Sequence, residues 1–130
     1  MNKILFFAFT ICTAFTSCSR KDGYSLFFKS SSVLGYNETE WQSEKCYIYY
    51  DSINFSIKRI LPNLQQYSVE YYDTLLVSDD GLNITCTTVN KLENRCDYFT
   101  YKISKDTLTY TYVPHIEHDW MSKIQRKYKN

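Results

Sequence analysis

The sequence predicts an all-β fold, a small antiparallel meander that forms a barrel or a sandwich. The chain contains 13 tyrosines but only three glycines and two prolines, so disorder from low complexity is not expected. Tyrosine, threonine, isoleucine and valine dominate its middle part, and these residues favour strands. Short alternating segments follow each other about every 8–12 residues with turns between them, which indicates antiparallel strands and not βαβ units.

The first part of the domain is predicted to contain strands at residues 24–29, 46–50 and 53–58. Residues 30–44 are polar and irregular, and we expect them to form a long loop. Asp51 and Ser52 separate the second and third strands and predict a tight hairpin turn. In the third strand the apolar residues alternate with polar ones, which is typical of a half-buried strand, at Ile53, Phe55 and Ile57.

The following strands are delimited by turn residues. Pro62 breaks the chain, and the segments between later turns are residues 67–71, 74–77, 82–87, 97–103 and 108–112. Two of these segments place a row of apolar residues on one face, namely Phe99, Tyr101 and Ile103, and then Leu108, Tyr110 and Tyr112. Gly81 ends the sequence Ser78-Asp79-Asp80-Gly81, where a turn accounts for the paired carboxylates better than acid–base chemistry does.

The last segment fits two structures. Ile116, Trp120, Ile124 and Tyr128 recur every four residues, as on an amphipathic helix. Trp120, Ile124 and Tyr128 also fit one face of a strand that could close a barrel. We favour the strand, because an uncovered sheet edge needs a partner.

The N-terminal segment has the order of a secretory signal peptide, with Lys3 followed by an uncharged apolar run over residues 4–15. The sequence Phe15-Thr16-Ser17-Cys18 resembles the lipobox of bacterial lipoproteins. The resemblance implies that residues 1–17 are a signal peptide, that Cys18 is lipidated and that residues 18–23 are a tether. It also implies anchoring in the bacterial cell envelope, most readily at the outer membrane. The alternative is an ordinary signal peptide with an incidental cysteine.

Residues 24–130 are expected to form a single β-domain. The run from Gly81 through Tyr101-Lys102-Ile103 and Asp106-Thr107-Leu108 to the Trp120 segment resembles the small lipocalin-like domains of bacterial lipoproteins. The resemblance implies a barrel whose mouth takes a small apolar ligand. The whole chain has 15 basic and 14 acidic residues without a basic block, which argues against a nucleic-acid partner.

The exported domain keeps three cysteines, in a compartment that permits disulfides. Cys86 and Cys96 flank one predicted hairpin and are the nearest pair, so they are the candidate disulfide, with the third cysteine free. Their positions along the strands place them on opposite faces unless a bulge intervenes, and Cys46 is the competing partner. A thiol nucleophile is not expected, because no histidine lies nearby in the sequence.

The segment from His115 to Asp119 contains the only residues with the spacing of metal ligands. His115 and His118 could hold zinc with a ligand from elsewhere, but a solvated loop after Pro114 explains the same residues. We expect no metal and no other cofactor. The sequence contains no nucleophile elbow, phosphate loop or zinc-protease motif, so a non-enzymatic protein is expected.

The tyrosines are the least ordinary feature, because so many phenols cannot all be buried without hydrogen-bond partners. Some are expected to line a cavity or an exposed face, with the candidate ligand-facing rings being Tyr67, Tyr71, Tyr110 and Tyr112. If at least three tyrosines share one concave surface, a binding protein is favoured. The alternative is that tyrosine simply replaces phenylalanine.

These features predict a lipid-anchored binding or interaction module for a small apolar ligand, a glycan or another envelope protein. A secreted inhibitor or immunity-type protein is an alternative. A metal-dependent hydrolase that uses residues 115–119 is a further, less favoured one. The sequence leaves the ligand, the oligomeric state and the side of the membrane open.

Overall fold

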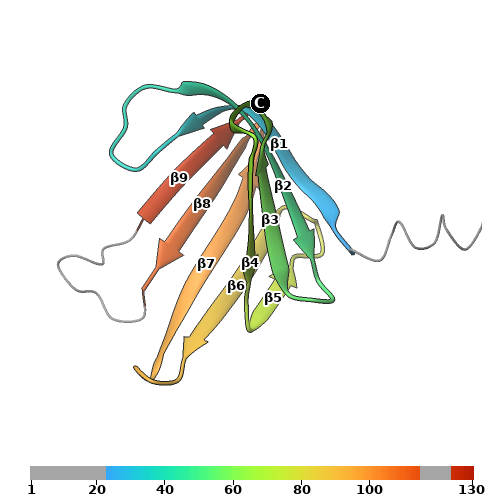
Figure 1. Ribbon diagram of the computed structural model, residues 1–130, viewed down its shortest axis with the longest axis vertical. Helices are drawn as coiled ribbons and strands as arrows, with labels where there is room; N and C mark the ends of the chain where they lie inside the picture. Colours follow the sequence, from blue (N-terminus) through green and yellow to red (C-terminus); the bar gives the residue numbers. More distant parts are fainter. Residues whose placement is uncertain (1–22, 115–123) are drawn as a thin grey trace, which may run out of the picture.

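The computed structural model describes residues 23–114 and 124–130, and it confirms the all-β class. Nine strands form one antiparallel sheet: β1 (Ser25–Leu34), β2 (Gln42–Asp51), β3 (Ser56–Leu61), β4 (Gln66–Tyr71), β5 (Thr74–Val77), β6 (Asn83–Asn90), β7 (Arg95–Ser104), β8 (Thr107–Val113) and β9 (Ile124–Lys129) (Figure 1). A 3₁₀ turn, Pro62–Leu64, separates β3 from β4, where the proline predicted a break. No helix within the described residues is long and apolar enough to span a membrane.

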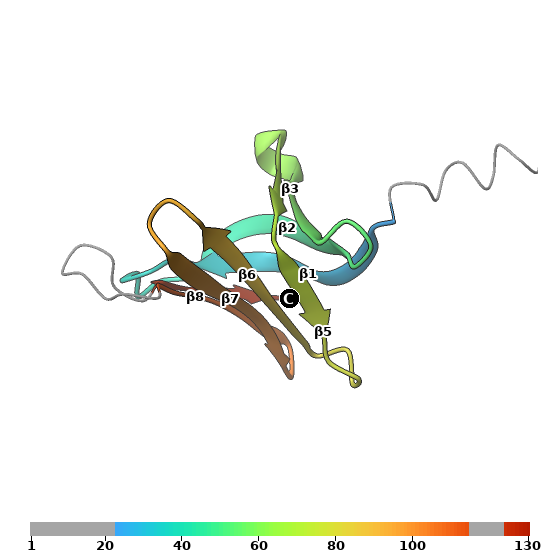
Figure 2. The same ribbon diagram turned by 90° about the horizontal axis from the view of Figure 1, so that it is seen from below.

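The sheet is a meander in which the first and the last strand of the chain, β1 and β9, pair with each other. Its order is β4-β3-β2-β1-β9-β8-β7-β6-β5, so β1 lies between β2 and β9. The two edges are therefore β4 and β5, which are consecutive in the chain. At their junction the Tyr72 N–H donates to the Phe55 carbonyl and the Asp73 N–H to the Thr87 carbonyl, both at 2.8 Å. The sheet curls strongly (Figure 2), but its edge strands β4 and β5 do not pair with each other, which makes the fold an open barrel.

The concave face of the sheet carries the core. Residues directly opposite each other in neighbouring strands share a face, as Ile84, Tyr101 and Tyr110 do across β6, β7 and β8. The buried side chains of this face include Ile48, Ile57, Leu75, Ile84, Cys86 and Leu108. The predicted inner rows of β7 and β8 are thus correct, because the strict alternation of those strands specifies one buried face.

The predicted loop over residues 30–44 is wrong at both its ends, and only residues 35–41 lie outside the strands. Strand β1 continues to Leu34, and β2 already begins at Gln42. The backbone of this polar stretch has partners on both sides, since Ser32, Val33 and Leu34 pair with the end of β9 while Ser32 and Val33 also pair with β2. Hydrogen bonding to two neighbouring strands therefore outweighs the low strand propensity of three consecutive serines.

The predicted start of the third strand is also wrong. Ile53 is 78 % exposed and Phe55 is 41 % exposed, and the strand begins only at Ser56. The Asp51 carboxylate accepts hydrogen bonds from the Ile53 and Asn54 backbone N–H groups at 2.9 and 3.1 Å and from the Asn54 side chain at 2.7 Å. These bonds hold residues 52–55 in a wider turn, because an aspartate side chain that binds the following amides competes with strand pairing.

For the last segment, the strand alternative is confirmed over residues 124–129. Ile124 and Tyr128 belong to β9, which pairs with β8 along its whole length and with β1 at its end. The predicted positions Ile116 and Trp120 lie outside the described residues.

Candidate functional site

A cavity of about 230 Å³ lies on the concave face, between the strands on either side of the open edge. Strands β2, β3 and β4 form one wall, and β7, β8 and β9 form the other. The lining is mixed: isoleucines and tyrosines stand beside charged and hydroxyl side chains, namely Ile48, Ile57, Arg59, Ser68, Glu70, Tyr101, Tyr110, Ile124, Arg126 and Tyr128. Such a combination of apolar surface and a few converging polar groups is typical of small-molecule sites.

Three tyrosine rings line this cavity, those of Tyr101, Tyr110 and Tyr128. Tyr101 and Tyr110 face each other across β7 and β8 with ring centroids 4.9 Å apart. The Tyr101 hydroxyl lies 3.5 Å from that of Tyr72, which donates to a Glu70 carboxylate oxygen at 2.6 Å. The Tyr128 hydroxyl accepts a hydrogen bond from Arg59 at 3.2 Å. Polar partners inside the barrel therefore explain how several phenols can be buried.

The four candidate tyrosines separate into two pairs. Tyr110 lines the cavity, and Tyr112 shares its face but packs against Phe99, with ring centroids 5.0 Å apart. Tyr67 and Tyr71 lie on the outer face of β4 and are 73 % and 70 % exposed. They point outward because the alternating positions of β4, occupied by Ser68 and Glu70, face the cavity.

The charged lining residues were not anticipated from the sequence, although a signal was present. Arg59 follows the inward-facing Ile57 by two positions, and Arg126 lies midway between Ile124 and Tyr128. Because strand side chains alternate with a period of two, an arginine in phase with apolar residues shares their face. The same spacing places both guanidinium groups inside the barrel.

Arg59 and Arg126 are half-buried and line two adjoining cavities. The second cavity, about 280 Å³, shares both arginines and Tyr128 with the first and is otherwise lined mainly from β1, β2 and the segment between them. Burial lowers the pKa of Arg59, but the hydrogen bond with Tyr128 and the nearby Cys46 and Glu70 side chains outweigh this effect and raise the pKa. The Arg59 guanidinium is therefore charged at neutral pH.

The predicted Cys86–Cys96 disulfide is not formed, and the three described thiols are free. Cys86 stands opposite Phe99 on the inner face, whereas Cys96 stands opposite Val89, so their side chains leave the sheet on opposite sides. Cys46, the competing partner, is buried on the inner face of β2. Burial raises the pKa of Cys46 to about 11 and that of Cys86 to about 12, so neither supplies a thiolate at neutral pH.

Within the described residues, no three His, Cys, Asp or Glu side chains gather closely enough to hold a metal ion. The predicted candidates His115, His118 and Asp119 lie outside the described residues, and so do Cys18 and the whole lipobox-like segment. The hydrolase alternative therefore gains no group from the described part of the chain. The absence of a cofactor stays a prediction.

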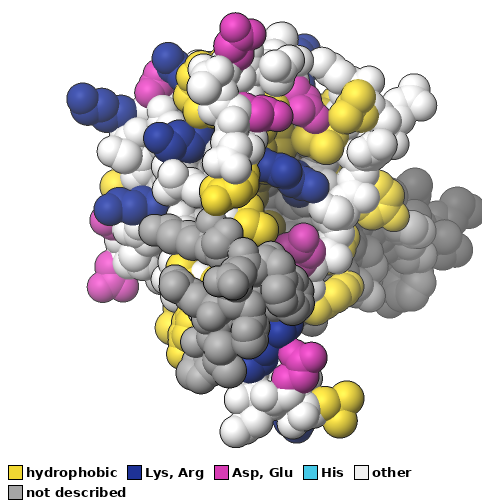
Figure 3. All heavy atoms as spheres, turned by 90° about the vertical axis from the view of Figure 1, so that its left-hand side faces the viewer, with side chains coloured by type: hydrophobic (Ala, Val, Ile, Leu, Met, Phe, Trp, Pro, Cys, Tyr) yellow, Lys and Arg dark blue, Asp and Glu magenta, His cyan; other side chains and the backbone are white. Residues whose placement is uncertain are grey.

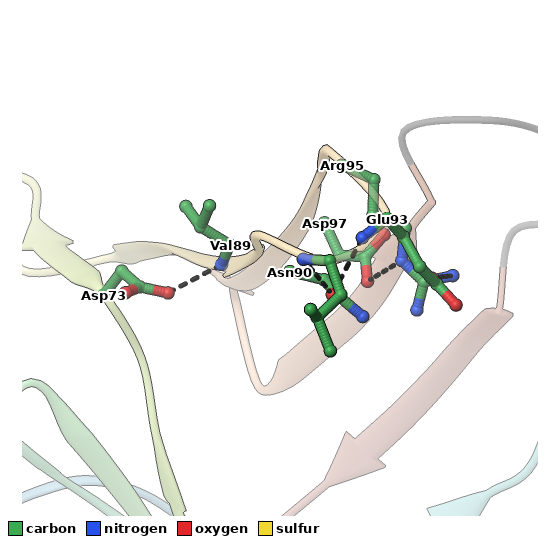
Figure 4. A network of polar contacts seen from close by, with 7 residues as sticks. Asp73, Val89, Asn90, Glu93, Arg95 and Asp97 are labelled. Atoms are coloured by element: carbon green, nitrogen blue, oxygen red, sulfur yellow. Dashed lines mark hydrogen bonds and ion pairs between the residues drawn. The ribbon is translucent and has the colours of Figure 1, made fainter.

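A separate group of polar residues lies where β6 ends and β7 begins, and it has a structural role. Asp73 accepts from the Val89 N–H at 2.6 Å, and Arg95 contacts Glu93 at 2.8 Å and Asp97 at 3.4 Å (Figure 4). The Asn90 side chain accepts from two backbone N–H groups of the following turn. These contacts fasten the β6–β7 turn and the start of β5, and none of their residues lines the tyrosine cavity.

Surface charge gives no further site on the face that carries β8 and β9. Basic and acidic side chains are interspersed there among the described residues, without an extended basic stripe (Figure 3). A nucleic-acid interface would need such a stripe. The expectation of no nucleic-acid partner stays a prediction.

Comparison with known proteins leaves the site to be interpreted from its own chemistry. No family model matches the chain, and no curated protein and no solved structure matches it significantly.

Proposed function

We propose that this protein is a non-enzymatic binding module that holds a small ligand inside its open β-barrel. The observation that carries the proposal is the cavity of about 230 Å³ with three tyrosine rings on its wall. This volume is below the ~300–1,000 Å³ of pockets that enclose drug-sized molecules, so the ligand is small. The mixed lining favours a ligand with both apolar and polar parts over the wholly apolar one implied by the lipocalin-like resemblance.

The chemistry of the described residues supports binding without catalysis. The buried thiols of Cys46 and Cys86 are held protonated, and burial also raises the pKa of Tyr110. A general base or nucleophile requires a group whose pKa lies near the working pH. The cavity therefore offers recognition groups and no activated nucleophile among the described residues.

The ligand site is tested by filling the cavity with a large side chain from the edge strand β4. Ser68 lines the cavity from the edge strand β4, so Ser68→Trp directs an indole ring into it. We expect it to abolish the fluorescence enhancement of N-phenyl-1-naphthylamine, a neutral probe, with a loss of affinity of about tenfold or more.

The matched control is Val69→Trp, which adds the same ring to the neighbouring position on the outer face of β4. It should leave the affinity for the probe within about twofold of wild type. Equal binding by wild type and both variants would locate the probe elsewhere and contradict the proposal. Absence of probe binding to wild type would contradict it as well.

The proposal includes attachment to the bacterial cell envelope, most readily the outer membrane, through a lipid on Cys18. It rests on the lipobox-like sequence Phe15-Thr16-Ser17-Cys18. Two acyl chains give stable membrane binding, since each buried methylene contributes ~0.8 kcal/mol. We expect the expressed wild-type protein to partition into membranes with the added mass of a diacylglycerol group, and Cys18→Ala to be recovered in the soluble fraction.

Cys96→Ala is the matched control for this experiment, because it removes a cysteine from the outer face of the domain and should leave partition unchanged. An unmodified wild-type mass together with a soluble wild-type protein would refute the lipid anchor. The cavity proposal is independent of that result.

A further inference from the structure

We infer that the ligand is a small amphipathic carboxylate whose anionic group binds between Arg59 and Arg126 inside the barrel. This inference rests on the proposed binding function and specifies the chemistry of the ligand. Both arginines line both adjoining cavities, so their guanidinium groups lie where the cavities meet. Guanidinium groups bind planar carboxylates through paired, charge-assisted hydrogen bonds.

The first argument is the unused hydrogen-bonding capacity of the two arginines. A guanidinium carries five N–H donors, and Arg59 directs one hydrogen bond to the Tyr128 hydroxyl. Arg126 makes no hydrogen bond with another described side chain, and neither arginine forms an ion pair with a carboxylate of the described residues. A bound carboxylate would use the donors that the described side chains leave open on the two guanidinium groups.

The second argument is the charge around the cavities. Glu70 is the only carboxylate lining the first cavity among the described residues, and it already accepts a hydrogen bond from Tyr72. Two guanidinium groups and one carboxylate leave one net positive charge there. The second cavity has two carboxylates in its lining: Glu38, which accepts a hydrogen bond from the Gly35 N–H, and Glu44. A monoanion therefore balances the lining of the first cavity, and we place the ligand there and not in the second cavity, where two more carboxylates lie.

The third argument is the position of the apolar lining. Ile48, Ile57 and Ile124 lie on the walls of the same cavity, together with the Tyr101 and Tyr110 rings. A ligand anchored by its carboxylate at the arginines would place a short hydrocarbon or aromatic part against these side chains. Burial of that part against the apolar lining would add to the affinity. Charge and apolar burial thus act on opposite ends of one small molecule.

The experiment compares octanoate with 1-octanol, which has the same chain without the charge. Binding to the full chain is followed by the NMR shifts of the isoleucine methyl groups, which report on the cavity directly through Ile48, Ile57 and Ile124. We expect octanoate to bind wild type about tenfold or more tightly than octanol, because hydrogen bonds to charged groups are the stronger ones.

The variants form two matched pairs, one on β3 and one on β9. In each pair one variant removes a positive charge from the inner face of the strand and the other removes one from the outer face. Arg126→Gln and Arg59→Gln should each weaken octanoate binding by about tenfold or more and leave octanol binding within about twofold. Lys127→Gln and Lys58→Gln make the same change in net charge on the outer face and should leave both ligands unaffected. Arg126→Lys keeps the charge but not the paired donors, so it should recover part of the loss.

Each outcome distinguishes the inference from the function on which it rests. Equal affinities for octanoate and octanol, unchanged in Arg126→Gln, would overturn the carboxylate site but keep the binding cavity. Equal losses in Arg126→Gln and Lys127→Gln would reduce the effect to overall charge and would also overturn the inference. Isoleucine methyl groups that respond to neither compound, in a protein that does not bind N-phenyl-1-naphthylamine either, would overturn both proposals. If Arg59→Gln fails to fold, Arg126→Gln decides the matter alone.

Discussion

Replacing Ile84 with alanine is expected to lower the free energy of unfolding by about 3–4 kcal/mol. Ile84 has no exposed surface and lies on the inner face of β6, opposite Val77 on β5 and Tyr101 on β7. The substitution removes three buried carbon atoms and leaves a void that the neighbouring strands cannot close, because both are held in register by backbone hydrogen bonds. The measurement is the urea midpoint and slope of equilibrium unfolding.

The matched control is Ile53→Ala, which makes the same chemical change at a side chain that is 78 % exposed in the turn before β3. Its effect should stay within about 0.5 kcal/mol. The order of these two effects depends entirely on where β3 begins. If Ile53→Ala destabilised the protein as much as Ile84→Ala, the strand predicted over residues 53–58 would be correct and the observed turn would not.

Asp51→Ala is also expected to have a large effect and to lower the free energy of unfolding by about 2–4 kcal/mol. The carboxylate is 1 % exposed and accepts three hydrogen bonds from the turn that follows it. Without it, two backbone N–H groups and the Asn54 amide lose their acceptor. Gly23 lies directly over the carboxylate, since a Cβ at that residue would stand 2.9 Å from both oxygens. Asp79→Ala, at an exposed position of a polar turn, should change stability by less than about 0.5 kcal/mol.

The contribution of Asp51 depends on pH with a definite sign. Burial alone would raise the pKa of Asp51, but the hydrogen bonds from Asn54 and Ile53 lower it below the usual value. A carboxyl group with a lowered pKa in the folded state stabilises the protein fully above its unfolded pKa of ~3.9. The stability difference between wild type and Asp51→Asn should therefore persist at neutral pH and shrink as the pH falls below about 4. A difference that grew in acid would contradict the assigned bonds.

The strands that alternate strictly could be predicted from the sequence, and those that depend on partners could not. The inner rows of β7 and β8 follow from a period of two that local residues specify, and they hold in the structure. The extent of β1 does not follow from Ser30-Ser31-Ser32, because its stability comes from pairing with β9, almost a hundred residues later. Propensity is a local quantity, whereas pairing with a distant strand is not.

The candidate site shows the same division at the level of single residues. Tyrosine abundance predicted that some rings would line a cavity, and Tyr110 does so. Tyr67 and Tyr71 were predicted to face the ligand as well, but they lie on the outer face of β4. The alternation of side chains separates the two faces of a strand but does not say which face is concave. Arg59 and Arg126 were in phase with inward-facing isoleucines, yet a charge on a strand is ordinarily taken to face solvent.

By itself, the sequence determined the all-β class, the approximate positions of most strands and turns, and the opposite faces of Cys86 and Cys96. These properties depend on the period of side chains along a strand and on turn residues, which act over a few positions. Only the tertiary structure decided that β1 pairs with β9 and that the barrel opens between β4 and β5. It also decided that two arginines from distant strands share one cavity. Those properties arise from the curl of the whole sheet, which brings together side chains that no local pattern relates.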